Sequence, residues 1–117
     1  MARFDPLQYI PLTPSMFQVL VALADGEKHG YAIIKEVVRR TDGAERLRPT
    51  TLYTILKRFE AEGLIEETAE RPDPALDDER RRYFRLTERG RAVAEAEAER
   101  LAATLARARA LLHPRRA

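Results

Sequence analysis

Small hydroxyl and cationic side chains gather in the stretch RPTTLYTILKRFEAEGLI, residues 48–65. When this stretch is drawn as a helix, Thr50, Thr54 and Lys57 fall opposite the apolar residues, and Tyr53 lies on a flank. Threonine can hydrogen-bond base edges or place its methyl group against thymine, and cations attract phosphate. The chemistry that these residue types favour is therefore recognition of a nucleic acid, with no bond made or broken.

Thr51 and Arg58 share the other flank of this helix, from which they can reach backbone phosphates. Acidic residues are confined to the last turn, so phosphate would approach the N-terminal half, where backbone N–H groups also attract it. A second interpretation stays open, in which Thr50 and Thr51 only cap the helix and Lys57 forms a solvated pair with Arg58.

A second cationic cluster lies in ERRRYFRLT, residues 79–87. Side chains alternate between the two faces of a strand, so Phe84 and Leu86 should share the core face. Three consecutive arginines then lie at the base of a hairpin, where neutralising phosphates would release counterions. The alternative is a solvated charge run balanced by nearby carboxylates. The three arginines are Arg80, Arg81 and Arg82.

Apolar periodicity and capping residues predict the elements that position these clusters. We expect three helices, a β-hairpin and a fourth helix, with a minimal strand at Leu47 as a further expectation. Three helices followed by a hairpin form the winged helix-turn-helix arrangement, with the hairpin as wing and the third helix as recognition helix. The fold class is therefore mainly α with a β-hairpin. The predicted segments are a helix from Thr13-Pro14 to Asp25-Gly26, helices Gly30–Arg40 and Pro49–Glu62, strands in LIEETAE and RRYFRLT joined by the loop RPDPALDDER, and a helix from Glu88 to about Leu112 with Thr87 as N-cap.

The last helix carries an apolar seam at alternating spacings of four and three residues, which is a heptad pattern. A helix of this length spans about 37 Å and overhangs a small domain. We therefore expect a homodimer, although packing of the helix on its own domain stays open. The seam residues are Ala94, Ala98, Leu101, Leu105, Ala108 and Leu112.

Charge along the same helix suits antiparallel pairing with a second copy, acid against base. The apolar N-terminal segment is a candidate for burial in the same interface. The acidic half carries Glu88, Glu95, Glu97 and Glu99, the basic half Arg107 and Arg109, and the N-terminal segment Phe4, Leu7, Ile10 and Leu12. The expected organisation is an N-terminal extension over residues 1–12, a winged helix-turn-helix DNA-binding domain over 13–87, and a C-terminal dimerisation helix and tail over 88–117.

Composition narrows the class of protein. The chain has 117 residues, of which 44% are hydrophobic and 34% charged, enough for one domain with a modest core. Cysteine is absent, which excludes disulfides and thiolate metal sites. The sequence has no apolar run of about 18 residues and no signal-peptide pattern, so we expect a cytoplasmic protein without a membrane partner.

An enzyme is not expected. The chain has only two histidines, His29 and His113, and no glycine-rich phosphate loop. His29 precedes a helix start, where capping or a phosphate contact suits it better than catalysis. We expect neither a metal nor a cofactor.

Three segments together resemble the PadR family of transcriptional regulators, in the small type with a single C-terminal helix. They are HGYAI at 29–33, PTTLYTILKRFEAEGLI at 49–65 and RRRYFRLTERG at 80–90. The resemblance implies a dimeric DNA-binding regulator, usually a repressor, with Tyr31, Tyr53 and the recognition-helix threonines near DNA. Some small relatives bind flat aromatic compounds at the dimer interface, and some of those use an indole. This chain lacks tryptophan, so an aromatic effector would need different contacts.

The sequence therefore predicts a homodimeric, sequence-specific regulator that binds double-stranded DNA. We expect a repressor that reads a roughly palindromic operator and is released by a small-molecule effector. The alternative is a winged-helix module that binds protein and not DNA. The predicted DNA-binding residues are His29, Tyr31, Thr50, Thr51, Tyr53, Thr54, Lys57, Arg58, Arg80, Arg81 and Arg82.

Overall fold

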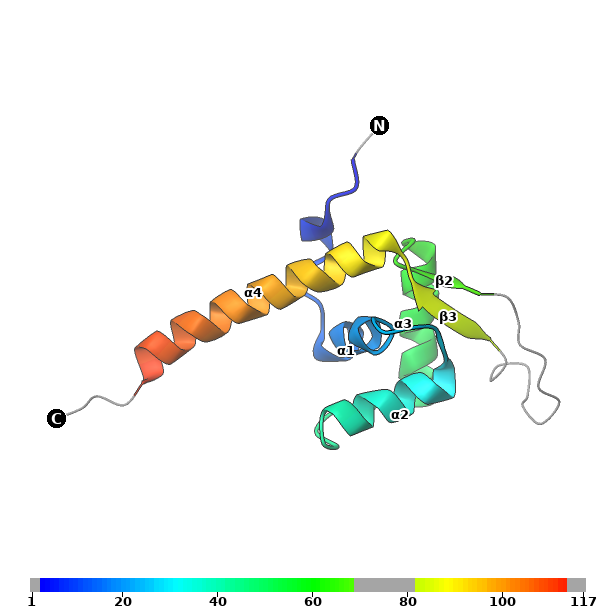
Figure 1. Ribbon diagram of the computed structural model, residues 1–117, viewed down its shortest axis with the longest axis horizontal. Helices are drawn as coiled ribbons and strands as arrows, with labels where there is room; N and C mark the ends of the chain where they lie inside the picture. Colours follow the sequence, from blue (N-terminus) through cyan, green and yellow to red (C-terminus); the bar gives the residue numbers. More distant parts are fainter. Residues whose placement is uncertain (1–2, 69–81, 114–117) are drawn as a thin grey trace.

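The computed structural model describes residues 3–68 and 82–113, and the predicted hairpin loop and C-terminal tail lie outside these ranges. The fold is mainly helical with a small antiparallel sheet, which confirms the predicted class. Figure 1 shows a helical body beside the sheet, with α4 crossing the body and running out past it. The elements in chain order are the 3-10 helix η1 (Pro6–Tyr9), α1 (Pro14–Ala22), β1 (Lys28–His29), α2 (Gly30–Arg40), α3 (Pro49–Ala61), β2 (Ile65–Glu67), β3 (Tyr83–Leu86) and α4 (Glu88–Leu112).

The predicted helix ends are formed by local hydrogen bonds. Thr13 Oγ1 accepts the Met16 N–H at 3.1 Å, and Thr87 Oγ1 accepts the Gly90 N–H at 3.0 Å. Gly63 follows α3 with a φ of +74°, the left-handed conformation that ends helices. The first helix ends at Ala22, earlier than predicted, because the chain from there to Gly26 continues in turns closed by bonds three residues apart.

The sheet has a third strand, β1, that was not predicted from the sequence. Strand β3 lies in the centre, with β2 on one side and β1 on the other, and Lys28 pairs with Phe84. The minimal strand expected at Leu47 is wrong. Leu47 is buried in the core, so its apolar character reflects side-chain packing and not backbone pairing.

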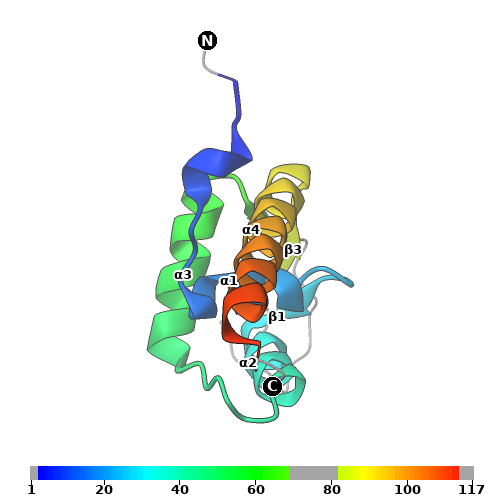
Figure 2. The same cartoon turned by 90° about the vertical axis from the view of Figure 1, so that its left-hand side faces the viewer.

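The body is held by a single hydrophobic core that joins α1, α2 and α3 to the sheet. Figure 2 looks nearly along α4 and shows α1 behind it and α3 to the left. The largest fully buried side chains include Phe59 of α3, Phe84 of β3 and Leu20 of α1. None of the described helices is long and apolar enough to cross a bilayer.

Gly90, in the first turn of α4, allows two backbones to meet. A Cβ atom at this position would lie 1.9 Å from the Leu64 carbonyl oxygen, well inside van der Waals contact. The same carbonyl accepts the Thr87 N–H at 3.1 Å, and Thr87 Oγ1 donates to the Gly63 carbonyl at 2.7 Å. The base of α4 is thus fixed against the turn that ends α3.

Glu97 ties the N-terminal segment to α4. Its side chain is 1% exposed, and its carboxylate accepts the Leu12 N–H at 2.7 Å and two bonds from the Arg100 guanidinium. The segment with Phe4 and Ile10 therefore packs on its own chain, against α4, and its burial in a dimer interface stays a prediction. Glu97 likewise has an internal partner and does not contribute to an acidic face for a second copy.

The two halves of α4 have different surroundings. Gly90, Val93 and Glu97 are buried, so the first half does fold back on its own domain. Beyond them the same stripe is exposed. The exposed fractions are 38% for Leu101, 50% for Leu105, 86% for Leu111 and 80% for Leu112. Of the predicted seam, Ala94 packs against the chain's own core, Ala98 is exposed and Ala108 is half-buried. Leu111 is exposed as well, but it lies outside the predicted seam.

We predict that Gly90→Ala destabilises the fold. The methyl group would push α4 off the Leu64 carbonyl, a cost of about 1–3 kcal/mol for overpacking, and this should exceed the gain of about 1 kcal/mol in helix propensity. Chemical denaturation would measure the free energy of unfolding. A variant as stable as the parent would contradict the close approach.

We also predict that Glu97→Ala loosens the N-terminal segment. The Leu12 N–H would lose its acceptor, at a cost of about 1–3 kcal/mol, and limited proteolysis should cut the segment faster. Glu97→Gln keeps an acceptor oxygen and should cost less. Equal cleavage of all three proteins would contradict this role.

Unfolding at several pH values tests the same carboxylate. The Arg100 hydrogen bond, followed by the Leu12 N–H, lowers the pKa of Glu97 below its usual 4.5, although desolvation opposes this. The ionised form therefore stabilises the fold above pH 4.5, and the contribution is lost as the pH falls through the lowered pKa. The stability difference between the parent and Glu97→Gln should shrink below that pH.

Candidate nucleic-acid interface

Helix α3 divides into a buried and an exposed face as its periodicity predicts. Thr50, Thr51, Thr54 and Lys57 are exposed, while the apolar residues of the helix enter the core. The N-cap is Arg48, and no side chain caps the helix, so the capping interpretation of the threonines is wrong. The first turn carries no acidic residue, and the exposed hydroxyl side chains Thr50 and Thr51 lie in it.

Thr54 has one specific restriction. Its hydroxyl donates to the Thr50 carbonyl oxygen at 3.0 Å, a bond within the helix. The donor is therefore used internally, and the methyl group and the oxygen lone pairs remain for a ligand. A contact with a thymine methyl group, or acceptance of a bond from a base amino group, suits this geometry.

The start of α2 packs against both α3 and the wing strand. His29 is the N-cap of α2, since its Nδ1 accepts the Ala32 N–H at 3.1 Å, and its ring meets Tyr83 edge-on. A Cβ on Gly30 would lie 2.6 Å from the Tyr53 hydroxyl oxygen, so the glycine lets Tyr53 lie across the start of α2. His29 and Tyr53, both predicted DNA contacts, thus also hold α2 in place.

Tyr31 lies on the outer side of the same helix end. Its side chain is 45% exposed, and the Lys35 amino group sits 4.6 Å from the centre of its ring. The pair presents a hydroxyl and a cation together, and both groups can hydrogen-bond phosphate.

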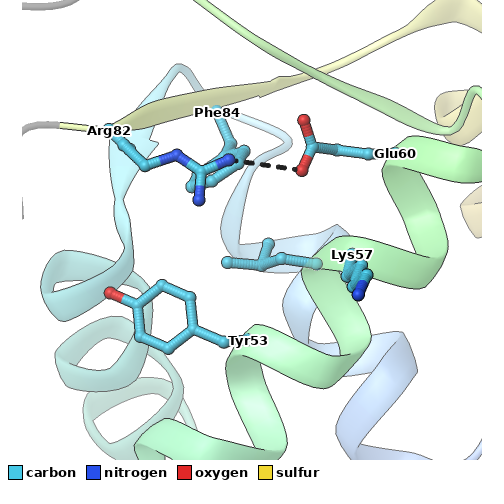
Figure 3. Close-up of a pocket in the computed structure, with 6 residues that line it drawn as sticks. Tyr53, Lys57, Glu60, Arg82 and Phe84 are labelled. Carbon is cyan, nitrogen blue, oxygen red and sulfur yellow. Dashed lines mark ion pairs between the residues drawn. The ribbon is translucent and has the colours of Figure 1, made fainter. Parts of the chain in front are cut away.

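A cleft of about 330 Å³ separates α3 from the wing. Figure 3 shows Tyr53, Lys57 and Glu60 entering it from α3, and Arg82 and Phe84 from the wing. The structure therefore brings three of the predicted residues, Tyr53, Lys57 and Arg82, around one space. Lys57 makes no ion pair with any described residue.

Arg82 is held in this cleft by two carboxylates. Its Nε donates to Glu67 Oε1 at 2.5 Å, its Nη2 lies 3.7 Å from Glu60 Oε1, and its guanidinium lies 5.4 Å from the centre of the Phe84 ring. The hydrogen bond to Glu67 raises the pKa of Arg82, while desolvation opposes the shift. The wing arginine is thus already paired in the free chain.

The other cations differ in position. In the last turn of α3, Arg58 Nε lies 3.4 Å from Oε1 of Glu62, the C-cap residue. Arg80 and Arg81 lie outside the described residues. On the opposite face of the wing from Phe84, Arg85 pairs with Glu66. No group of three or more potential metal ligands forms in the described ranges.

Glu60 and Glu67 also belong to this site, although they were not predicted from the sequence. We expected the acidic end of α3 to lie away from bound phosphate, whereas Glu60 lines the same cleft as Lys57. The hairpin register pairs Glu67 with Phe84, next to Arg82. A predicted register could have revealed the Glu67–Arg82 contact, because diagonal neighbours on one face of an antiparallel pair lie close enough to interact.

The sequence model of the transcriptional regulator PadR-like family matches residues 19–96. A curated relative, an uncharacterized 37.1 kDa protein in a transposon of Streptomyces fradiae, is 42% identical over 84 residues, which are 72% of this chain and 22% of that protein. The chain thus spans about a fifth of the length of this relative.

Solved structures share the fold. A transcriptional regulator from Clostridium thermocellum is 26% identical with a TM-score of 0.70, over 83% of this chain and 91% of that one. Bacillus subtilis PadR in complex with operator DNA is 20% identical with a TM-score of 0.60, over 78% of this chain and 48% of that one.

Proposed function

The chain belongs to the PadR-like family of transcriptional regulators, and we propose that it is a homodimeric, sequence-specific DNA-binding repressor. One observation carries the proposal. The N-terminal half of α3 is an exposed helix face of hydroxyls and a lysine, without a carboxylate in its first turn. A face of this kind can enter a major groove, since small polar side chains allow close approach and the helix N-terminus attracts phosphate.

In this proposal each part of the surface has a separate task. Thr50, Thr54 and Lys57 read base edges from the centre of the α3 face, and Thr51 and Arg58 contact backbone from its flank. Tyr31 contacts phosphate from the start of α2, beside His29 and Tyr53. The wing arginines, Arg80 to Arg82, add affinity that does not depend on sequence. Such a regulator works on the chromosome, so the proposal places it in the cytoplasm.

The exposed stripe on α4 supports a dimer. Leu101, Leu105 and Leu112 continue the seam beyond the body, where a second copy could bury them, and Leu111 is exposed near the same end of the helix. A two-fold dimer would present two α3 helices to half-sites about one helical turn apart, which implies a roughly palindromic operator. We further propose that a small aromatic effector releases DNA by binding near this interface. A cleft of about 290 Å³ beside the stripe, lined in part by Leu12, Phe17 and Leu101, supports such a site.

DNA binding is tested by gel shift with the DNA upstream of the chain's own gene, at several salt concentrations. Thr54→Ala should change the affinity ratio between operator variants by about five- to a hundredfold. Thr54→Val keeps a methyl group and separates that contact from the oxygen contact. Arg81→Ala with Arg82→Ala should weaken binding to all sequences and lower the salt slope by about 0.9 for each phosphate that the protein no longer neutralises.

Absence of binding to any duplex at low salt would refute the proposal in favour of a protein-binding module. Variants that left both affinity and preference unchanged would show that the DNA-binding face had been misassigned.

Dimerisation is tested with Leu105→Glu. A buried charge without a partner should weaken the self-association constant by at least about tenfold. Ala103→Glu, on the exposed opposite side of α4, introduces the same charge and should remain dimeric. Sedimentation equilibrium measures both. A monomeric parent protein, or equal weakening by the two variants, would contradict the proposed interface.

A further inference from the structure

Arg82 offers a cation whose availability the chain itself controls. The guanidinium lies over Phe84 at the mouth of the cleft between α3 and the wing, beside Lys57 and Tyr53 (Figure 3). A DNA backbone that contacts both α3 and the wing would place a phosphate near this guanidinium. In the free chain, however, Glu67 and Glu60 lie 2.5 and 3.7 Å from its nitrogens.

The local charge balance is unfavourable for a phosphate. Among the described residues, one guanidinium facing two carboxylates leaves this corner with a net negative charge, which Lys57 across the cleft offsets. The pairs are partly exposed, with 43% of the Arg82 side chain and 39% of the Glu67 side chain accessible. Such pairs are weak in water, so they can exchange for a contact with phosphate.

We propose that Glu67, assisted by Glu60, competes intramolecularly with DNA phosphate for Arg82 and so limits the affinity of this chain for DNA. The inference rests on the proposed function and deepens it. Glu67 is the stronger competitor, because it makes the direct hydrogen bond, whereas Glu60 is at ion-pair distance. Binding to DNA requires Arg82 to turn from Glu67 toward the backbone, while its stacking on Phe84 keeps the guanidinium near the cleft.

The structure supplies a matched control on the neighbouring residue. Glu66 precedes Glu67 in β2 and pairs with Arg85 on the opposite face of the sheet. Glu66→Gln removes the same charge from the same strand, but leaves Arg82 paired with Glu67. It therefore measures the general effect of one carboxylate less near DNA.

The test measures binding of a fluorescein-labelled mixed-sequence DNA duplex by anisotropy, at several salt concentrations. Glu67→Gln should bind about two- to fivefold more tightly than the parent, as expected for release of an exposed ion pair. The salt slope should become steeper by up to about 0.9, the value for one additional phosphate contact. Glu66→Gln should change the affinity by less than about twofold.

A double-mutant cycle isolates the role of Arg82. In an Arg82→Gln background, Glu67→Gln should give no more gain than Glu66→Gln gives in the parent. An unchanged or weaker affinity for Glu67→Gln, or the same gain with and without Arg82, would overturn the inference while leaving DNA binding intact. A parent protein that binds no duplex would overturn the proposed function, and this inference with it.

Discussion

The contact between Gly90 and the Leu64 carbonyl is the constraint on which the arrangement of the molecule depends. It joins the turn that ends α3, the strand that begins the wing and the base of α4 within a few ångströms. No side chain separates these backbones, so α4 cannot shift without moving the others. The direction in which α4 leaves the body is therefore tied to the orientation of α3 and of the wing.

Ion pairing of individual side chains, more than the net charge, determines which charges this protein presents at its surface. The formal net charge is +2, and the exposed N-terminal half of α3 has no acidic side chain in its first turn. Arg82 and Arg85 of the wing each form an ion pair with a carboxylate from the neighbouring strand β2. Lys57 is unlike them, since it makes no ion pair with a described residue. The electrostatic surface offered to a ligand thus depends on internal ion pairs that are weak enough to exchange.

Features that depend on neighbouring residues could be predicted from the sequence. Thr13 and Thr87 cap helices through bonds to the third residue beyond them, and Gly63 adopts the conformation that its place after α3 requires. The exposed face of α3 follows from periodicity in the same way. Contacts between distant residues could not be predicted. The pairing of β1, the burial of Glu97 against Leu12 and the approach of Glu60 to Arg82 all depend on how elements meet in space.

The anchoring of α4 has a mechanical consequence. Gly90 and Glu97 clamp its first half to the body, so the exposed half behaves as a stiff lever, of about 22 Å if the last 15 residues are counted. A partner that binds the exposed half would turn the whole body, and α3 with it. Among the described residues, the contacts at Gly90 and Glu97 hold α4 to the body. The coupling would also act in the opposite direction, since the coupling free energy between two binding sites is reciprocal. A ligand that reorients α3 would therefore also move the C-terminal end of α4.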